Sequence, residues 1–203
     1  MIRISIECHV DYDLLSLLKD SAKSLEMKLD TSNSANEVFE FILERLRGYF
    51  IDQGVKPDTF EAVRSLKPTR LLDFDKRIQA VQTFRELIEA DSLAAANKRI
   101  SNILKKADNV NNKIDDSLFS EAAEKELHKQ LSALEKVVTP KFESREYTQA
   151  LTDLAQLRST IDTFFDDVMV MDENEKVRNN RIALLAKVNR LFSTVADISL
   201  LQS

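Results

Sequence analysis

Glycine is nearly missing from this chain, because only two of its 203 residues are glycine, about 1% against the ~7% usual in globular proteins. Proline is also scarce, with three residues. Tight hairpins and loops that cradle phosphates need glycine where the backbone φ must be positive. The shortage therefore excludes glycine-rich nucleotide loops and favours an all-α fold of helices joined by short polar turns.

Cysteine is limited to Cys8, so an internal disulfide is excluded and a reducing cytoplasm is the expected location. Cys8 and His9 are not followed by a second Cys/His pair, and no metal site is expected because structural zinc normally takes four ligands. No apolar run approaches the ~20 residues of a membrane-spanning helix. The opening MIRISIECHV is too short and too interrupted by charge for a secretory signal. Neither a membrane nor DNA is an expected partner.

Apolar periodicity predicts a series of helices. Residues 2–9 alternate as in a strand, but no partner strand is evident nearby, so the tail of a helix is expected there instead. Capping residues are expected at Ser34, Asp58, Asp73, Asp91 and Ser144, and helix ends at Gly54, before Pro68 and near Pro140. Residues 108–120 are polar and are expected to form a loop.

Each predicted helix has an apolar stripe that should face the core. The stripes comprise Leu14, Leu18, Ala22 and Leu25; Val38, Ile42, Leu46 and Tyr49; Phe74, Ile78, Val81, Phe84 or Arg85, and Ile88; Leu127, Leu131, Leu134 and Val138; Tyr147, Leu151, Leu154, Leu157, Ile161 and Phe165; and Ile182, Leu185, Val188, Phe192 and Val195. Short connections between them indicate an all-α helical bundle, with a second block that begins at about residue 69.

One predicted helix has an unusual polar face. AAANKRISNILKK, residues 94–106, holds four basic side chains and two asparagines. At 100° per residue, its apolar side chains fall within an arc of about 100°, and these are Leu93, Ala96, Ile100, Ile103, Leu104 and Ala107. No acid interrupts the opposite side, whereas a helix that meets only water usually mixes both signs of charge. A solvated outer face is the alternative interpretation.

Two segments of this acidic chain, whose net charge is −5, are net positive. Residues 70–110 hold 8 basic and 6 acidic side chains, and residues 178–203 hold 4 and 1, whereas residues 1–69 and 111–177 are net negative. The second positive segment begins with RNNR, Arg178 to Arg181. If the two helices pack side by side, they form one basic, amide-rich surface that attracts a polyanion. A helix terminus with exposed arginines is the alternative for RNNR.

Several long stretches resemble the C-terminal region of the bacterial glycyl-tRNA synthetase beta subunit. They are FILERLRGYFIDQGVKPDTFEAV (41–63), PTRLLDFDKRIQAV (68–81), LAAANKRISNILKK (93–106), FFDDVMVMDENEKVRNNRIALLAKV (164–188) and VADISLLQ (195–202). The stretch 164–188 is also similar, more loosely, to the helical anticodon-binding domains of arginyl and some other class I synthetases. The resemblance covers nearly the whole chain and is weakest over residues 1–30.

The resemblance implies a DALR-like anticodon-binding bundle over residues 69–203, preceded over residues 1–68 by the C-terminal part of a neighbouring domain. Family beta subunits are several times longer, so Met1 is expected to begin a fragment. It further implies glycine–tRNA ligase activity in an alpha2beta2 tetramer, whose alpha subunit binds ATP, with magnesium, and glycine. The expected partners are the glycine tRNA and that alpha subunit.

Unpaired loops display bases that a protein can stack and hydrogen-bond, and the glycine anticodon contains two cytosines. The residues expected to contact tRNA are Asn97, Lys98, Arg99, Ser101, Asn102, Lys105 and Lys106, with Arg178, Asn179, Asn180 and Arg181 as further candidates. Phe74 or Phe84 can stack a base, although their spacing also fits core packing. No catalytic constellation is present, so the isolated chain is expected to be non-catalytic. A helical protein-interaction module, or the anticodon-binding domain of a related synthetase such as the arginyl enzyme, is the alternative.

Overall fold

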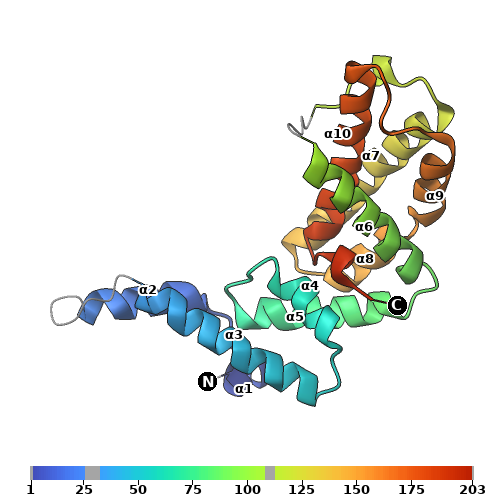
Figure 1. The fold of residues 1–203 in the computed structure, drawn as a ribbon. Helices are drawn as coiled ribbons and strands as arrows, with labels where there is room; N and C mark the ends of the chain where they lie inside the picture. The colour runs from blue at the N-terminus through green and yellow to red at the C-terminus, as the bar shows by residue number, and fades with distance from the viewer. Residues whose placement is uncertain (1, 26–32, 108–112, 203) are drawn as a thin grey trace.

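The computed structural model describes residues 2–25, 33–107 and 113–202. Within these residues the regular secondary structure is entirely helical, which confirms the predicted all-α class (Figure 1). The elements are α1 (Ile2–Glu7), α2 (Leu14–Leu25), α3 (Ser34–Asp52), α4 (Pro57–Arg64), α5 (Leu71–Arg85), α6 (Ala90–Lys106), the 3-10 turn η1 (Asp116–Leu118), α7 (Ala122–Glu143), α8 (Tyr147–Ala155), α9 (Arg158–Asp167), α10 (Glu175–Ser193) and the 3-10 turn η2 (Ile198–Leu200).

The helices form an arm and a bundle (Figure 1). Helices α2 and α3 pack on each other and project away from the rest, whereas α6 to α10 gather around one core. Helix α5 contacts α1 and α4 on the arm side and α8 on the bundle side. η2 returns the chain to α4 and α6. The arm and the bundle are therefore joined by α5 and again by the segment that contains η2.

The bundle core is built from aliphatic and aromatic side chains that are fully shielded from water. They include Leu93, Ile100, Leu127, Leu131, Leu151, Leu154, Ile161, Phe164, Leu184, Leu185, Val188 and Phe192. Burying each such side chain contributes roughly 1.5–3 kcal/mol relative to leaving it exposed. A second group of aromatic rings packs around Phe74 where the arm meets α5. The ring centroids of Phe50 and Phe60 lie 5.8 Å and 5.2 Å from that of Phe74, and 6.3 Å from each other. This burial accounts for the stripes that the sequence predicted correctly.

Helix starts differ from the expected caps. The observed N-cap residues are Asn33, Lys56, Arg70, Glu89 and Glu146, so the predictions of Ser34, Asp58, Asp73, Asp91 and Ser144 were wrong. The aspartates are the second or third residues of their helices, where a carboxylate still interacts favourably with the helix dipole. Asp58 and Asp73 are instead bound by arginines from the same or another helix.

Helix α3 buries a different stripe from the one predicted. Phe39, Leu43 and Phe50 are buried, whereas Val38 is 42% exposed. Apolar residues occur in adjacent pairs along α3, so two stripes one residue apart both have helical spacing. Packing against α2 and α4 selects the stripe that carries two phenylalanines, and Leu46 belongs to both.

Three other boundaries were misplaced. Helix α5 ends at Arg85, so Ile88 lies in the following turn and is 88% exposed. Pro140 lies within α7, which continues to Glu143, because losing one backbone donor near a helix end does not stop the last turn. The single helix expected after residue 144 is two helices, α8 and α9, and Phe164 rather than Phe165 occupies the core.

The expected end at Gly54 is confirmed, since α3 stops at Asp52 and Gly54 adopts a φ of 87°. The expected helix at residues 2–9 is confirmed as α1. Of the loop predicted at 108–120, residues 108–112 lie outside the described part of the chain, and the remainder contains only η1.

Candidate nucleic-acid interface

Helix α6 has one face in the core and one face in solvent, as its sequence predicted. Leu93, Ala96 and Ile100 are buried, and the later apolar residues of the stripe are half-buried. The opposite side carries exposed polar side chains, which are Lys98, Arg99, Asn102, Lys105 and Lys106, with Ser101 half-buried beside them. The helix thus presents four cations and one amide to solvent along about two turns.

These four cations form no ion pair with an acidic side chain in the part of the chain that the structure describes. None of the ion pairs among the described residues includes Lys98, Arg99, Lys105 or Lys106. By contrast, Arg64 on the arm lies within 4 Å of three glutamates. The positive charge on α6 is therefore left uncompensated and available to a polyanion.

Arg99 is the one cation of this group with a fixed neighbour. Its guanidinium carbon lies 4.1 Å from the ring centroid of Phe165 in α9, within the distance of a favourable cation–π contact. Phe165 in turn meets Phe164 edge-on, with centroids 5.6 Å apart. Core packing of α9 therefore positions an exposed arginine on α6.

Asn97, predicted to contact RNA, is inside the protein. Its side chain is 0% exposed, and its Nδ2 donates to the Leu93 carbonyl at 2.9 Å, while its Oδ1 has no partner. The residue lies beside the apolar stripe, and α6 is covered there because α10, α9 and η2 all pack on this helix. Asn97 is consequently not available to a base, which corrects the sequence-based assignment.

The RNNR stretch at the start of α10 is mainly structural. Arg181 is 2% exposed and pairs with Glu124 at 2.9 Å and Asp172 at 2.8 Å. It also donates to the Met169 carbonyl. Burial lowers the pKa of this guanidinium, but the two carboxylates outweigh that effect and raise it above its ordinary value. Arg181 holds α10 to α7 and does not reach solvent.

Asn180 is also occupied within the protein. It is 4% exposed, and its side chain accepts from the Asp115 amide at 2.8 Å and donates to the Asp115 carbonyl at 3.0 Å. The amide therefore ties the segment before η1 to α10. Asn180 and Arg181 are thus corrected from tRNA contacts to structural residues, for the same reason as Asn97.

Arg178 and Asn179 remain accessible. Asn179 is exposed, and Arg178 is half-buried and donates to the Asp172 carbonyl at 2.9 Å. Asn179 lines a hollow of about 280 Å³ together with Lys113, Asp115, Leu118, Lys176 and Asn180. The later cations of α10, Lys187 and Arg190, share Glu135 of α7.

The expected pairing of the two positive helices is half right. Helices α6 and α10 do contact each other in the bundle (Figure 1). However, α10 is buried from Asn180 to Leu185, so its interior residues cannot line a surface groove. The uncompensated charge lies on α6, and α10 adds only the residues of its first turn and Asn179.

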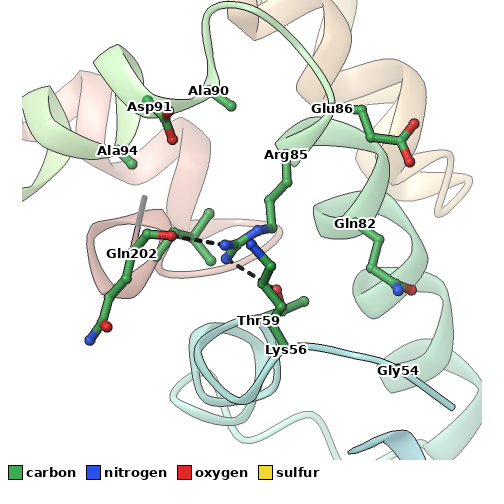
Figure 2. Close-up of a pocket in the computed structure, with 11 residues that line it drawn as sticks. Gly54, Lys56, Thr59, Gln82, Arg85, Glu86, Ala90, Asp91, Ala94 and Gln202 are labelled. Carbon is green, nitrogen blue, oxygen red and sulfur yellow. Dashed lines mark hydrogen bonds between the residues drawn. The ribbon is translucent and has the colours of Figure 1, made fainter.

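A larger hollow, of about 410 Å³, lies where the arm, the bundle and residues 201–202 meet (Figure 2). Arg85 crosses it and donates to the Gln202 carbonyl at 2.8 Å and to Asp58 at 2.7 Å. The lining also includes one further cation, Lys56, and two carboxylates, Glu86 and Asp91. The hollow is therefore of mixed charge and adds nothing to the positive surface of α6.

The aromatic residues suggested for base stacking are in the core. Phe74 is 0% exposed among Phe50 and Phe60, and Phe84 is 1% exposed against Phe192. The aromatic residue that lies beside the exposed face of α6 is Phe165 of α9, which is half-buried and contacts Arg99. The sequence pattern predicted that Phe165 faces the core. The Phe164–Phe165 pair was the available signal, since adjacent helical residues point about 100° apart and only one can face inward.

Two further site types are absent from the described residues. No group of three or more histidine, cysteine, aspartate or glutamate side chains there could hold a metal ion. No helix in the same part of the chain has both the length and the apolar character needed to cross a bilayer.

Comparison with known proteins places this surface in context. A model of the DALR anticodon binding domain matches residues 93–199, which run from α6 to η2. The chain is 46% identical over 203 residues to the glycine–tRNA ligase beta subunit of Coxiella burnetii (strain Dugway 5J108-111) and 47% identical over 202 residues to that of Pseudomonas aeruginosa (strain LESB58). Each alignment covers 99% of this chain and 30% of the relative. The chain thus spans about a third of the length of these relatives.

Proposed function

The chain belongs to the DALR anticodon binding domain family, and on this premise we propose that it recognises the anticodon loop of the glycine tRNA within a glycine–tRNA ligase beta subunit. The observation that carries the proposal is the unpaired positive charge on α6, which lies inside the matched region. The choice of the glycine tRNA follows from the relatives, because those aligned above are glycine–tRNA ligase beta subunits.

The exposed side chains suit an unpaired RNA loop. Lysines attract phosphates without regard to sequence, whereas an amide can hydrogen-bond a base edge. Cytosine offers an N4 donor and O2 and N3 acceptors, which the side chain of Asn102 can match with its own acceptor and donor. The proposed contacts are Lys98, Arg99, Ser101, Asn102, Lys105 and Lys106 on α6, with Arg178 and Asn179 on α10.

Catalysis is assigned to other parts of the proposed enzyme. We propose an alpha2beta2 tetramer in the cytoplasm, in which the alpha subunit binds ATP with magnesium and glycine. The residues described here do not fit an ATP site, since they include neither a glycine-rich phosphate loop nor a cluster of three or more histidine, cysteine, aspartate or glutamate side chains for a metal. The role proposed for this chain is to bind and select tRNA. Residues 69–203 are proposed as the anticodon-binding unit and residues 1–68 as part of its neighbour.

A protein-docking role is the second candidate, and the arm favours it. Leu17 of α2 and Val38 and Phe41 of α3 are 48%, 42% and 59% exposed, on helices that project from the bundle. Exposed apolar side chains on a projecting hairpin are typical of a surface that meets another protein.

A binding titration tests the proposal. The protein is titrated with the glycine tRNA anticodon stem-loop and with a stem-loop in which both anticodon cytosines are replaced, at several salt concentrations. We expect replacement to weaken binding at least tenfold, since each lost base contact costs about 1–3 kcal/mol. Equal affinity for both RNAs, or no binding to either, would reject anticodon recognition and favour the docking role. The arginine tRNA stem-loop tests the alternative of a related synthetase.

A further inference from the structure

Arg99 contacts an aromatic ring and is also exposed to solvent. Its guanidinium carbon lies 4.1 Å from the centroid of the Phe165 ring. The Arg99 side chain is nevertheless exposed. One turn before it stands Ala95, which is also exposed and whose side chain is a single methyl group.

The other close arginine–aromatic contacts in the described part of the chain differ from this one. Arg77 lies over Tyr147 at 4.5 Å, but it also pairs with Asp73 at 2.7 Å and donates to two backbone carbonyls. Arg45 lies over Phe41 at 5.3 Å, within a single helix. Arg99 combines a near ring from another helix with a charge that forms no ion pair among residues 2–25, 33–107 and 113–202.

The two helices that carry this pair are fixed to each other. Two turns before Arg99, Ser92 donates to the carboxylate of Asp162 at 3.2 Å, and Asp162 is further paired with Arg158 at 3.4 Å. Phe165 packs edge-on against the fully buried Phe164. The position of the Phe165 ring beside Arg99 is therefore set before any ligand arrives, which reduces the entropy that binding must remove.

We propose that Arg99, supported from beneath by Phe165, is a platform on which one unpaired nucleobase of the RNA stacks. This inference rests on the proposed function and refines it, because it assigns Arg99 to a base and not to a phosphate. A guanidinium is planar and weakly hydrated and stacks on aromatic planes, which a lysine ammonium does not do. Splayed RNA bases are commonly stacked on arginine planes. Asn102, one turn after Arg99, is placed to hydrogen-bond the edge of the same base.

Substitutions separate stacking from simple charge. Arg99→Lys keeps the charge and removes the plane, and Phe165→Leu keeps an apolar side chain and removes the ring. Lys105→Gln is the matched control, because it removes an exposed charge that makes no cation–π contact with a ring among the described residues. Binding is measured with the glycine anticodon stem-loop at several salt concentrations, with 2-aminopurine replacing one loop base at a time as a fluorescent reporter of stacking.

We expect Arg99→Lys to weaken binding about tenfold, the loss typical of one stacked base, without changing the slope of log Kd against log salt. Phe165→Leu should give a smaller loss, also without a change of slope. Lys105→Gln should reduce the slope by about 0.7, as expected for one phosphate contact. The 2-aminopurine signal at one loop position should respond to wild-type protein and fail to respond to Arg99→Lys.

Two results would overturn the platform. The first is wild-type affinity and signal for Arg99→Lys while the wild-type protein still discriminates the anticodon cytosines. If Phe165→Leu unfolds, Arg99→Lys alone decides, since it removes nothing from the core. The second result applies if the protein does not discriminate the anticodon, so that the proposed function fails. A single-stranded RNA hexamer carrying 2-aminopurine then tests the stack directly, and an equal response with both proteins rejects it.

Discussion

Arg181 of α10 and Glu124 of α7 form an ion pair of 2.9 Å between two side chains that are 3% and 0% exposed. Glu124 also accepts hydrogen bonds from the backbone amides of Ser120 and Glu121 at the start of α7. The pair therefore joins the first turn of one helix to the second turn of another. An arginine that the sequence offered as an RNA contact is instead part of the internal structure of the bundle.

Removal of this carboxylate is expected to destabilise the protein strongly. Glu124→Ala leaves the guanidinium of Arg181 buried with only Asp172, and breaking a buried pair costs about 3–5 kcal/mol. Urea unfolding measures the loss of free energy. Glu126→Gln on the same helix is the control, since its pair with Lys129 is exposed and 3.8 Å apart, and it should cost less than about 1 kcal/mol. Similar losses for both variants would contradict the structural role of Glu124.

The two asparagines of α6 should behave oppositely. Asn97→Leu removes a buried oxygen that has no hydrogen-bond partner, and it should leave stability unchanged or raise it by about 1 kcal/mol, with RNA affinity unaltered. Asn102→Ala should weaken RNA binding about tenfold if the proposed function holds, with no change in melting temperature. Thermal melting and stem-loop binding are compared for both variants. A loss of RNA binding by a stably folded Asn97→Leu would contradict the burial argument.

This contrast shows what the sequence could and could not predict. Helical periodicity places Asn97 and Asn102 on α6 and correctly puts Leu93, Ala96 and Ile100 in the core. Whether a residue beside that stripe is covered depends on the neighbouring helices, and periodicity within one helix does not contain that information. The stretch 93–106 carried the family resemblance without revealing which of its polar side chains is buried.

The same limit explains the errors at adjacent pairs. Val38 and Phe39, like Phe164 and Phe165, offer two apolar faces with equal helical spacing, and tertiary packing decides which one is covered. The burial of charged residues is equally hard to predict, because Arg178 and Arg181 are the same residue type one helical turn apart. Arg181 is buried because Glu124 and Asp172, distant in sequence from each other, converge on it. Composition and long matched stretches predicted the class and the family, and the individual contacts required the coordinates.

Salt dependence should report the lysines of α6. Under the proposed function, Lys106→Gln is expected to reduce the slope of log Kd against log salt by about 0.7, because one fewer phosphate is neutralised. Lys129→Gln on α7 is the control for a general loss of charge, and it should leave the slope unchanged. Equal reductions for the two variants would show that attraction is diffuse and not localised on α6.

Alkaline pH should weaken the contact between α5 and α8. Burial, reinforced by the hydrogen bond to Asp73, raises the pKa of Tyr147 to about 12. The folded state therefore favours the protonated phenol, so this stabilisation is complete below about pH 10 and is lost as pH rises towards 12. Tyr147→Phe should lower the free energy of unfolding by about 1–3 kcal/mol at neutral pH, since Asp73 loses a donor at 2.7 Å.

Unfolding by urea between pH 7 and pH 11 measures this effect. The wild-type protein should lose stability above pH 10 more steeply than Tyr147→Phe does. Parallel pH profiles would contradict the assigned role of the phenol.

Acid should release the contact between Asp58 and Arg85. Burial alone would raise the pKa of Asp58, but hydrogen bonds from Arg85 and from the Gln202 amide outweigh it and hold the pKa below its ordinary value. The resulting stabilisation is present above about pH 4 and is lost as pH falls through the lowered pKa. Asp58→Asn should therefore destabilise the protein at pH 7 by about 1–3 kcal/mol and have a smaller effect near pH 2.

The matched control is Asp20→Asn, whose exposed pair with Lys23 is 3.6 Å apart. It should be nearly neutral at both pH values in urea unfolding. A destabilisation by Asp58→Asn that does not depend on pH would point to lost packing instead of lost charge.

The return of residues 197–202 to the arm has a mechanical consequence. The Asp197 amide donates to the Ala62 carbonyl at 2.9 Å, and the Gln202 amide donates to Asp58 at 2.7 Å. Helix α5 makes the other crossing. Two separate connections between the arm and the bundle resist rotation of one part against the other, whereas a single linker would allow it. The direction of α2 and α3 relative to α6 is therefore fixed by both connections, and we expect a displacement of the arm to be transmitted to the bundle.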